Sequence, residues 1–179
     1  MKQEIEIKIL NIDAKKLSMN IKNLGGKKIL EPTLLSELYF ESPIRNPRYS
    51  SFRLRSEGKQ TLLTLKMKKD DPHFEIRDEY QVEVQSFEMT KQILELAGFK
   101  VFRQREKIRE SYMVETVRVE IDTYPHMKPY AEIEAASKKD ALKFLKQIGF
   151  ELEYASKKTA TEIIRDAGLN PDDLMFEKK

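Results

Sequence analysis

Residues 1–10 read MKQEIEIKIL, and the alternation inside this stretch decides the fold. Isoleucine occupies positions 5, 7 and 9, whereas charged residues occupy positions 4, 6 and 8. Because successive side chains of a strand point to opposite faces, this period of two predicts a strand with one apolar and one charged face. These residues alone do not say whether the charged face meets water or lines a binding site.

The same alternation returns along most of the chain, and about eight strands are predicted in total. After the first, the expected strands cover residues 36–41, 51–56, 61–68, 74–84, 102–114, 116–122 and 130–135. Segments rich in Pro, Gly, Asp and Asn separate them, among them the predicted turn ESPIRNPRYS at residues 41–50. Links this short favour antiparallel pairing.

Three amphipathic segments between the strands predict helices with recognisable ends. They cover residues 13–24, 87–97 and 138–148, and a glycine follows each one. Asp13 and Ser137 are good N-cap residues, because their side-chain oxygens accept hydrogen bonds from the free N–H groups of the first turn. A fourth helix is expected near residues 159–167. The chain is therefore predicted to be a single domain over residues 1–168, followed by a loosely held C-terminal tail at residues 169–179.

The composition excludes several classes of site and partner. There are 33 Lys or Arg against 30 Asp or Glu, and a net charge of +3 argues against a nucleic-acid partner. The absence of cysteine excludes disulfides, zinc–thiolate sites and cysteine nucleophiles. No apolar signal core and no apolar run of about 18 residues is present, so no membrane association and a cytoplasmic location are predicted.

The charged residues of the expected strands sort by sign. The strands at 51–56, 61–68 and 102–114 carry Lys and Arg, whereas those at 2–9, 74–84, 116–122 and 130–135 carry most of the carboxylates. Two interpretations remain open. An open antiparallel sheet would leave the charged face in water. Alternatively, about eight strands suffice to close a barrel around one small ligand, with the charges inside.

A closed barrel with this lining has a specific chemical meaning. Buried charges need partners, so such an interior is tolerable only when it is wet and holds ions. Lys and Arg suit phosphate oxygens, and grouped Asp and Glu suit Mg²⁺ or Mn²⁺. The barrel interpretation therefore predicts a site for a metal-bound polyphosphate.

The order of short blocks resembles one known family. Residues 4–8 match the E-x-E-x-K signature of the CYTH superfamily, the triphosphate tunnel metalloenzymes. Blocks similar to those of the family follow in order: ELYF (37–40), SFRLR (51–55), LTLK (63–66), RDEYQVEV (77–84), REKIR (105–109), VEID (119–122) and AEIE (131–134). The resemblance extends to about residue 166 and is closest to the CyaB-like branch, which includes class IV adenylate cyclases and relatives of thiamine triphosphatase.

The resemblance implies a fold of the α+β class, mainly antiparallel β: a closed eight-stranded antiparallel barrel, or tunnel, with helices packed outside. It also implies roles for individual residues. The metal ligands would be Glu4, Glu6, Glu120, Asp122, Glu132 and Glu134. The phosphate-binding residues would be Lys8, Arg53, Arg55, Lys66, Lys107 and Arg109. Tyr39 and Lys66 resemble a catalytic tyrosine–lysine pair that helps to activate water.

Three functions follow from the resemblance. The one we expect is a phosphohydrolase that uses Mg²⁺ or Mn²⁺ to act on an inorganic or organic triphosphate, because hydrolysis needs fewer specific contacts than cyclisation. The alternatives are a class IV-type adenylate cyclase, which makes cyclic AMP and pyrophosphate from ATP, and a non-catalytic polyphosphate-binding module. The ligand would be tripolyphosphate, a nucleoside triphosphate or thiamine triphosphate. A homodimer stays open.

Overall fold

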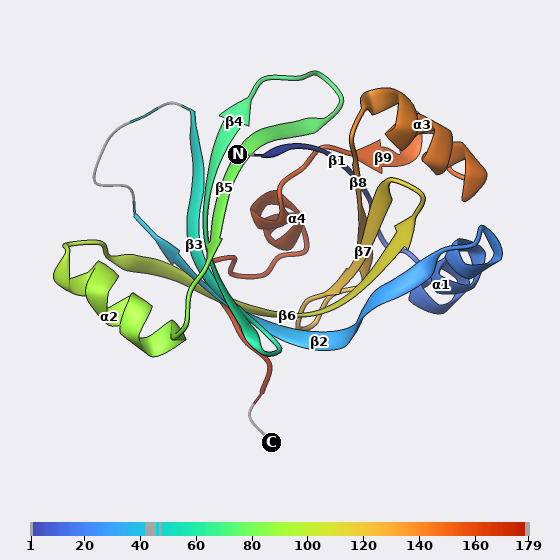
Figure 1. Cartoon of the computed structure of the whole chain (residues 1–179). Coiled ribbons are helices and arrows are strands. Elements are labelled where there is room, and N and C mark those ends of the chain that lie inside the picture. The colour runs from blue at the N-terminus through green and yellow to red at the C-terminus, as the bar shows by residue number, and fades with distance from the viewer. Residues whose placement is uncertain (1, 42–45, 47, 178–179) are drawn as a thin grey trace.

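The computed structural model describes residues 2–41, 46 and 48–177, and its long strands form one closed ring (Figure 1). These strands are β1 (Lys2–Ile9), β2 (Lys27–Phe40), β3 (Tyr49–Glu57), β4 (Gln60–Lys69), β5 (Glu75–Glu83), β6 (Val101–Val114), β7 (Val117–Thr123) and β8 (Tyr130–Ala135). Around the ring they follow the order β6–β2–β3–β4–β5–β1–β8–β7, and β7 pairs with β6 to close it. Every pairing in the ring is antiparallel, so the predicted eight-stranded antiparallel barrel is confirmed.

The period of two in the sequence separates the outside of the barrel from its inside. On β1, Ile5 and Ile7 are buried in the largest apolar cluster, which lies outside the barrel wall. The helices α1 (Ala14–Asn23) and α3 (Lys138–Gln147) contribute Ile21 and Phe144 to the same cluster. Figure 1 shows both helices on the outer side of the ring, near β1, β7 and β8. The charged residues of β1 therefore point to the interior.

The helix ends follow the capping signals of the sequence. Asp13 accepts a hydrogen bond from the backbone N–H of Lys16 at 3.0 Å, and Ser137 accepts one from Asp140 at 3.1 Å. The helix α2 (Phe87–Leu96), on the opposite side of the ring in Figure 1, packs with Phe40 and Leu54 in a smaller apolar cluster. None of the helices in the described ranges is long and apolar enough to span a membrane.

The strand β2 is much longer than the predicted strand at residues 36–41. Its pairing with β6 shifts register between Lys28 and Leu30 and again between Leu30 and Thr33. A β-bulge adds a residue on one strand and so interrupts the alternation of side chains. The sequence from residue 27 to 35 consequently lacks the period of two on which the strand prediction depended. Residues 42–45 and 47 of the predicted turn lie outside the described residues.

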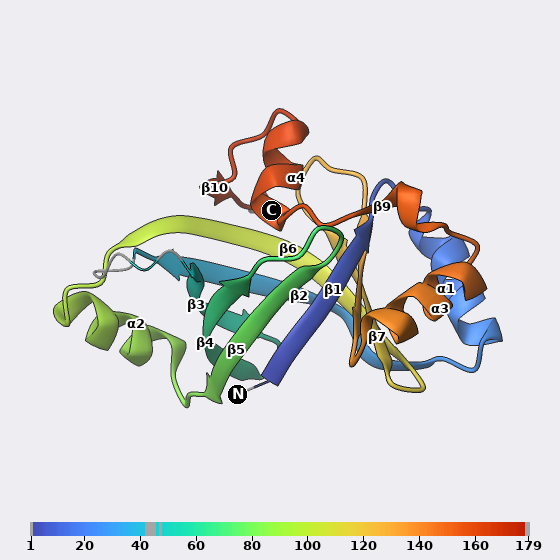
Figure 2. The ribbon, with the colours of Figure 1, turned by 90° about the horizontal axis from the view of Figure 1, so that it is seen from above.

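The expectation of a loosely held tail is wrong for the part that the structure describes. After α3 come a short 3₁₀ turn at Leu152–Tyr154, β9 (Ala155–Ser156), which pairs with β1, and α4 (Ala160–Asp166). The helix α4 lies over one end of the barrel (Figures 1 and 2). Beyond it, β10 (Asp173–Leu174) pairs in parallel with β6, and Leu174 packs with Tyr130 and Ile164. These apolar contacts hold the segment; residues 178 and 179 of the predicted tail are outside the described ranges.

Candidate functional site

The interior of the barrel holds a cavity of about 340 Å³ with a mainly charged wall. Among the described residues that line it, ten are Lys or Arg and seven are Glu. The sequence left open whether the charged faces meet water on an open sheet or face inward. Ring closure decides for the inward orientation, and we call this cavity the tunnel.

Charges of opposite sign occupy opposite halves of the tunnel wall. The strands β6, β2, β3 and β4 are consecutive in the ring and form what we call the basic half. The acidic half consists of β5, β1, β8 and β7, which are also consecutive. The three strands that carry mainly Lys and Arg therefore lie together, although β6 is far from β3 and β4 in the sequence. A ligand in the tunnel meets cationic side chains on one side. On the other side it meets seven glutamates together with Lys8, Arg77 and Arg118.

All six predicted phosphate-binding residues line the tunnel: Lys8, Arg53, Arg55, Lys66, Lys107 and Arg109. The Nε atoms of Arg53 and Arg55 are buried and have no hydrogen-bond partner among the described residues. Burial lowers the pKa of Arg55, and the nearby cations Arg53 and Arg109 lower it further. Arg53 pairs with Glu37 at 2.8 Å and Arg55 with Glu57 at 2.7 Å, so each guanidinium holds one carboxylate and keeps an Nε donor without a partner.

The junction of β6 with β7 ties the two halves together. Lys107 donates to Asp122 at 2.7 Å, and the Arg109 guanidinium donates to both Asp122 oxygens at 2.6 and 2.5 Å. Arg109 also donates to Glu132 at 2.7 Å and contacts Glu120. Burial alone would lower the pKa of Arg109, but these carboxylates raise it well above its usual value. Arg109 therefore remains a cation at the centre of the site.

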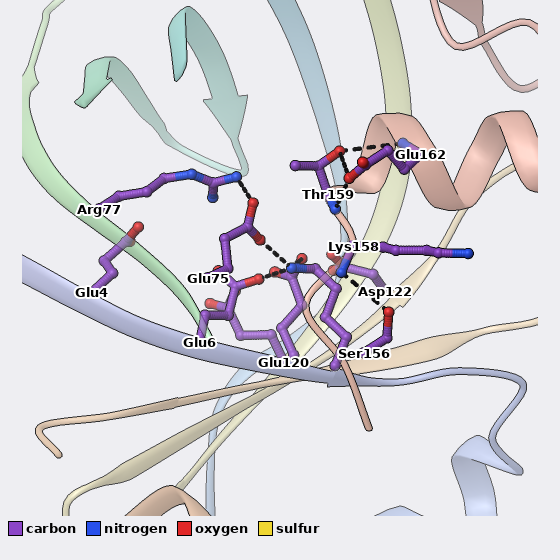
Figure 3. Close-up of polar contacts among 12 residues, drawn as sticks. Glu4, Glu6, Glu75, Arg77, Glu120, Asp122, Ser156, Lys158, Thr159 and Glu162 are labelled. Carbon is purple, nitrogen blue, oxygen red and sulfur yellow. Dashed lines mark hydrogen bonds and ion pairs between the residues drawn. The ribbon is translucent and has the colours of Figure 1, made fainter. Parts of the chain in front are cut away.

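Lys8 lies in the acidic half, among carboxylates. Its Nζ atom is 2.5 Å from Glu75 and 3.8 Å from Glu132, and it also contacts Glu6. Figure 3 shows Glu6 and Glu75 on the same part of the wall. In the same half, Lys66 reaches across from β4 and donates to Glu4 at 2.6 Å, with Glu79 at 3.2 Å. Both amines thus bring positive charge to the places where a metal ion is predicted.

Five of the six predicted metal ligands line the tunnel: Glu4, Glu6, Glu120, Glu132 and Glu134. The sixth, Asp122, is fully buried in the wall and held by Lys107 and Arg109. Within the described ranges, no three Asp, Glu or His side chains lie close enough together to hold one metal ion as they stand. The first four carboxylates of the set each pair with Lys or Arg instead.

The chemistry of this carboxylate set nevertheless fits a hard divalent cation. Burial raises the pKa of Glu120, and the neighbouring carboxylates Glu132 and Asp122 raise it further against the opposing effect of Arg109. Repulsion among buried carboxylates is relieved by a cation between them, and Mg²⁺ and Mn²⁺ prefer such oxygen ligands. Glu4, Glu6, Glu120, Glu132 and Glu134 would hold the ion, once their present partners turn to phosphate.

The predicted tyrosine–lysine pair is not in direct contact. The Tyr39 hydroxyl donates to Glu37 at 2.9 Å, whereas Lys66 pairs with Glu4 and Glu79. Glu37 is a residue that the sequence-based site missed, although the period of two places it on the same face of its strand as Tyr39. Arg105 was likewise left out, although it is on the same face as Lys107 and is 1% exposed.

A second cavity, of about 790 Å³, adjoins the end of the tunnel near α4. We call it the rim pocket; its lining comprises Ser50, residues 68–72, residues 74–77, residues 157–159 and Glu162. It shares Ser50, Glu75, Arg77 and Thr159 with the tunnel. Figure 3 draws Glu75 and Arg77 on one side of this opening and Thr159 and Glu162 on the other. Pro72, Phe74 and Ile76 give the rim pocket an apolar part that the tunnel lacks.

Comparison with known proteins agrees with this geometry. Residues 2–165 match the model of the CYTH domain. The chain belongs to the CYTH domain family. A Methanocaldococcus jannaschii protein, provisionally named an adenylate cyclase, is 30% identical over 133 residues, which are 73% of this chain and 75% of that protein.

Solved structures show the same fold in other CYTH-like chains. A Pyrococcus horikoshii protein superposes with a TM-score of 0.77 at 23% identity, over 93% of this chain and 99% of the other. A Vibrio parahaemolyticus protein, provisionally called an adenylate cyclase, superposes with a TM-score of 0.79 at 16% identity, over 92% of this chain and 98% of the other. A Hippeastrum protein is described as a provisional adenylyl cyclase with a dominant triphosphatase activity. It superposes with a TM-score of 0.65 at 18% identity, over 94% of this chain and 98% of the other.

Proposed function

We propose that this CYTH protein is a divalent-metal-dependent phosphohydrolase that cleaves a triphosphate inside the tunnel. The observation that carries the proposal is the pair of buried, unpartnered Nε donors of Arg53 and Arg55, opposite a wall of carboxylates. A chain of phosphates bound through divalent ions presents negative oxygens to one half and metal ions to the other. The charge on both halves would thereby be neutralised.

The residues of the basic half and those of the acidic half would have different roles. In the basic half, Arg53, Arg55, Lys66, Lys107 and Arg109 would hold the phosphate oxygens, and Lys8 would reach them from the acidic half. Glu4, Glu6, Glu120, Glu132 and Glu134 would hold Mg²⁺ or Mn²⁺, with Asp122 fixing Lys107 and Arg109 from behind. The metal ion would supply charge neutralisation at the phosphorus under attack.

Positioning and electrostatics account for most of the rate in phosphoryl transfer. A water molecule would attack the terminal phosphorus and lose a proton, while the bond between that phosphorus and the bridging oxygen breaks. The bridging oxygen departs on the remaining diphosphate, and the attacked phosphorus is released with the water oxygen as inorganic phosphate. Lys66 is the catalytic residue that we propose for this step, because its ammonium group is within the tunnel and can donate to an oxygen on which charge develops. Tyr39 stays a predicted catalytic partner of Lys66 from the family resemblance.

Adenylate cyclase is the second candidate function, and the rim pocket is the observation that favours it. This pocket has room and apolar surface for an organic group whose triphosphate occupies the tunnel. In that reaction the ribose 3′-hydroxyl attacks the α-phosphorus and pyrophosphate leaves. The names of the Methanocaldococcus and Vibrio proteins agree with this candidate, and the description of the Hippeastrum protein favours hydrolysis. A cytoplasmic location and a homodimer stay predictions.

One panel of reactions separates the candidates. The purified chain is incubated with Mg²⁺ or Mn²⁺ and with tripolyphosphate, ATP or thiamine triphosphate, and the products are identified. We expect inorganic phosphate to be released. Cyclic AMP with pyrophosphate would support the cyclase instead, and binding without turnover would support a non-catalytic polyphosphate-binding module.

A further inference from the structure

The strand β2 separates two strands that carry arginines, and its own interior residues contact them. Glu37 is opposite Arg55 of β3 and Arg105 of β6, and Tyr39 is opposite Arg53 and Arg103 in the same pairings. Figure 1 shows β2 running alongside β6 on one side of the ring. Each of these four arginines therefore lies opposite Glu37 or Tyr39.

Glu37 holds one of these arginines directly. Its side chain is completely buried, accepts a hydrogen bond from Arg53 Nη1 at 2.8 Å, and accepts another from the Tyr39 hydroxyl at 2.9 Å. Burial alone would raise the pKa of Glu37, but Arg53, Lys107 and Arg55 together hold it at about 2. Glu37 is thus an anion fixed inside the basic half, and it leaves the Arg53 Nε donor free.

Tyr39 uses both its hydroxyl and its ring for contacts within the wall. The hydroxyl is bound to Glu37, and the Cζ atoms of Arg103 and Arg105 lie 5.5 and 5.4 Å from the ring centroid. At such distances a guanidinium is attracted to the face of an aromatic ring. Arg105 donates its hydrogen bonds to neutral oxygens, at 2.5 Å to the Pro171 carbonyl and 2.8 Å to the Thr161 hydroxyl. Arg103 instead donates to Asp172 at 2.7 Å and to the Thr161 hydroxyl at 3.1 Å.

We propose that Glu37 and Tyr39 act together as positioning residues, which hold Arg53 and Arg105 in the orientation that receives the phosphates. This inference rests on the proposed function, and it assigns Tyr39 a different role from that of a catalytic partner of Lys66. The geometry supports it because the hydroxyl that would activate water is already donated to a buried carboxylate. A positioning residue affects affinity for the triphosphate more than it affects the chemical step.

Substitutions that remove one contact at a time test the proposal. Tyr39→Phe keeps the ring under Arg103 and Arg105 but removes the hydroxyl, whereas Glu37→Gln keeps an acceptor but removes the charge. We expect Glu37→Gln to raise the KM for tripolyphosphate about tenfold, with less than a threefold change in kcat. Tyr39→Phe should raise KM about threefold to fivefold, and the shape of its pH–kcat profile should match that of the wild type.

If Tyr39 were instead a catalytic residue, Tyr39→Phe would lower kcat and leave KM unchanged. Loss of a group that transfers a proton lowers kcat by about a hundredfold or more and removes one limb of the pH profile. That result for Tyr39→Phe, with KM unchanged, would overturn the proposal. Tyr80→Phe is the matched control, because Tyr80 is 47% exposed, and it should leave both constants unchanged. Thermal unfolding of each variant checks that it is folded.

Binding of tripolyphosphate, measured by calorimetry without turnover, separates this inference from the proposed function. If the wild type binds tripolyphosphate but releases no phosphate, the hydrolase proposal fails and the affinities still test Glu37. A loss of affinity of about tenfold in Glu37→Gln supports the positioning role, and an unchanged affinity contradicts it. A wild-type chain that binds none of tripolyphosphate, ATP and thiamine triphosphate would overturn both proposals.

Discussion

The two halves of the tunnel are held in place from different sides. Behind the acidic half, α1 and α3 pack the largest apolar cluster against β1, β7 and β8. Behind the basic half the apolar support is smaller, with Phe40 and Leu54 packed on Leu94 of α2. The basic half is instead held by hydrogen bonds inside the tunnel, where Glu37 accepts from Arg53 and from Tyr39.

This difference indicates which side chains can rearrange when a ligand arrives. The carboxylates of the acidic half are bound mainly to cations that point into the tunnel, such as Lys8 and Lys66. They can exchange those partners for a metal ion while the wall stays fixed by its outer core. In the basic half, Glu37 already fixes Arg53, so under the proposed function the orientation of this guanidinium would be set before a phosphate binds. Such preorganisation reduces the ordering cost of binding.

The largest effect should come from Arg55. Replacing it with alanine removes charge-assisted hydrogen bonds worth about 1.5–3 kcal/mol, so tripolyphosphate should bind roughly ten- to a hundredfold more weakly. Burial and the cations Arg53 and Arg109 disfavour the charge of Arg55, whereas its 2.7 Å ion pair with Glu57 favours that charge, so the melting temperature of Arg55→Ala is measured to check that the variant folds. Calorimetry and thermal unfolding measure the two quantities. Lys143→Ala on the outer surface is the control, and a lower melting temperature with unchanged affinity would contradict the assignment.

Acid should weaken the contacts of Glu37 with Arg53 and Tyr39 in the basic half. The pKa of Glu37 is about 2 in the folded chain and about 4.3 in an unfolded one, so its ionised form stabilises the fold above about pH 4.3. That contribution, about 3 kcal/mol, is lost as the pH falls from about 4.3 through 2. The difference in unfolding free energy between the wild type and Glu37→Gln should shrink by this amount over that range. A difference that does not change with pH would contradict the interpretation.

The third prediction concerns the C-terminal segment with α4 and β10, which lies over one end of the barrel. Leu174 is 6% exposed, and truncation of a buried leucine costs about 2 kcal/mol or more. In Leu174→Ala, amide hydrogen exchange should become faster in α4 and β10, while β1 and β8 should stay protected. Met175→Ala is the control, since Met175 is 38% exposed. Equal loss of protection throughout the barrel would show that this segment is not a separate cooperative unit.

The smallest of these effects concerns the acidic half. Glu6→Gln should raise the Mg²⁺ or Mn²⁺ concentration needed for half-maximal activity by about tenfold, a cost of about 1.4 kcal/mol. Affinity for metal-free tripolyphosphate should not fall, because the substitution removes a negative charge from the tunnel. Glu95→Gln, on the outside of α2, is the comparison. An unchanged metal requirement would remove Glu6 from the proposed ligands.

Alternation along single strands predicted most of the wall but not the contacts between its halves. The period of two is local, so it placed Glu4, Arg53 and Lys66 on the charged faces of their strands without knowledge of strand order. The pairing of Glu37 with Arg53, and of Lys66 with Glu4, depends on which strands are neighbours, and that is a property of the closed ring. The packing of Leu174 was missed for another reason: the segment around it has no period, and its neighbours come from β8 and α4.

The order of strands in the ring also bears on how the chain folds. The strands β2 to β5 pair in sequence as one meander, and β6 to β8 pair as another. Only two seams join these meanders in the described chain: β2 with β6, and β1 with both β5 and β8. The seam at β1 brings residues 2–9 against residues 130–135, a separation that makes closure slow. The strand with Glu4 and Glu6 is therefore expected to join late in folding, and the acidic half would exist only once the whole barrel is complete.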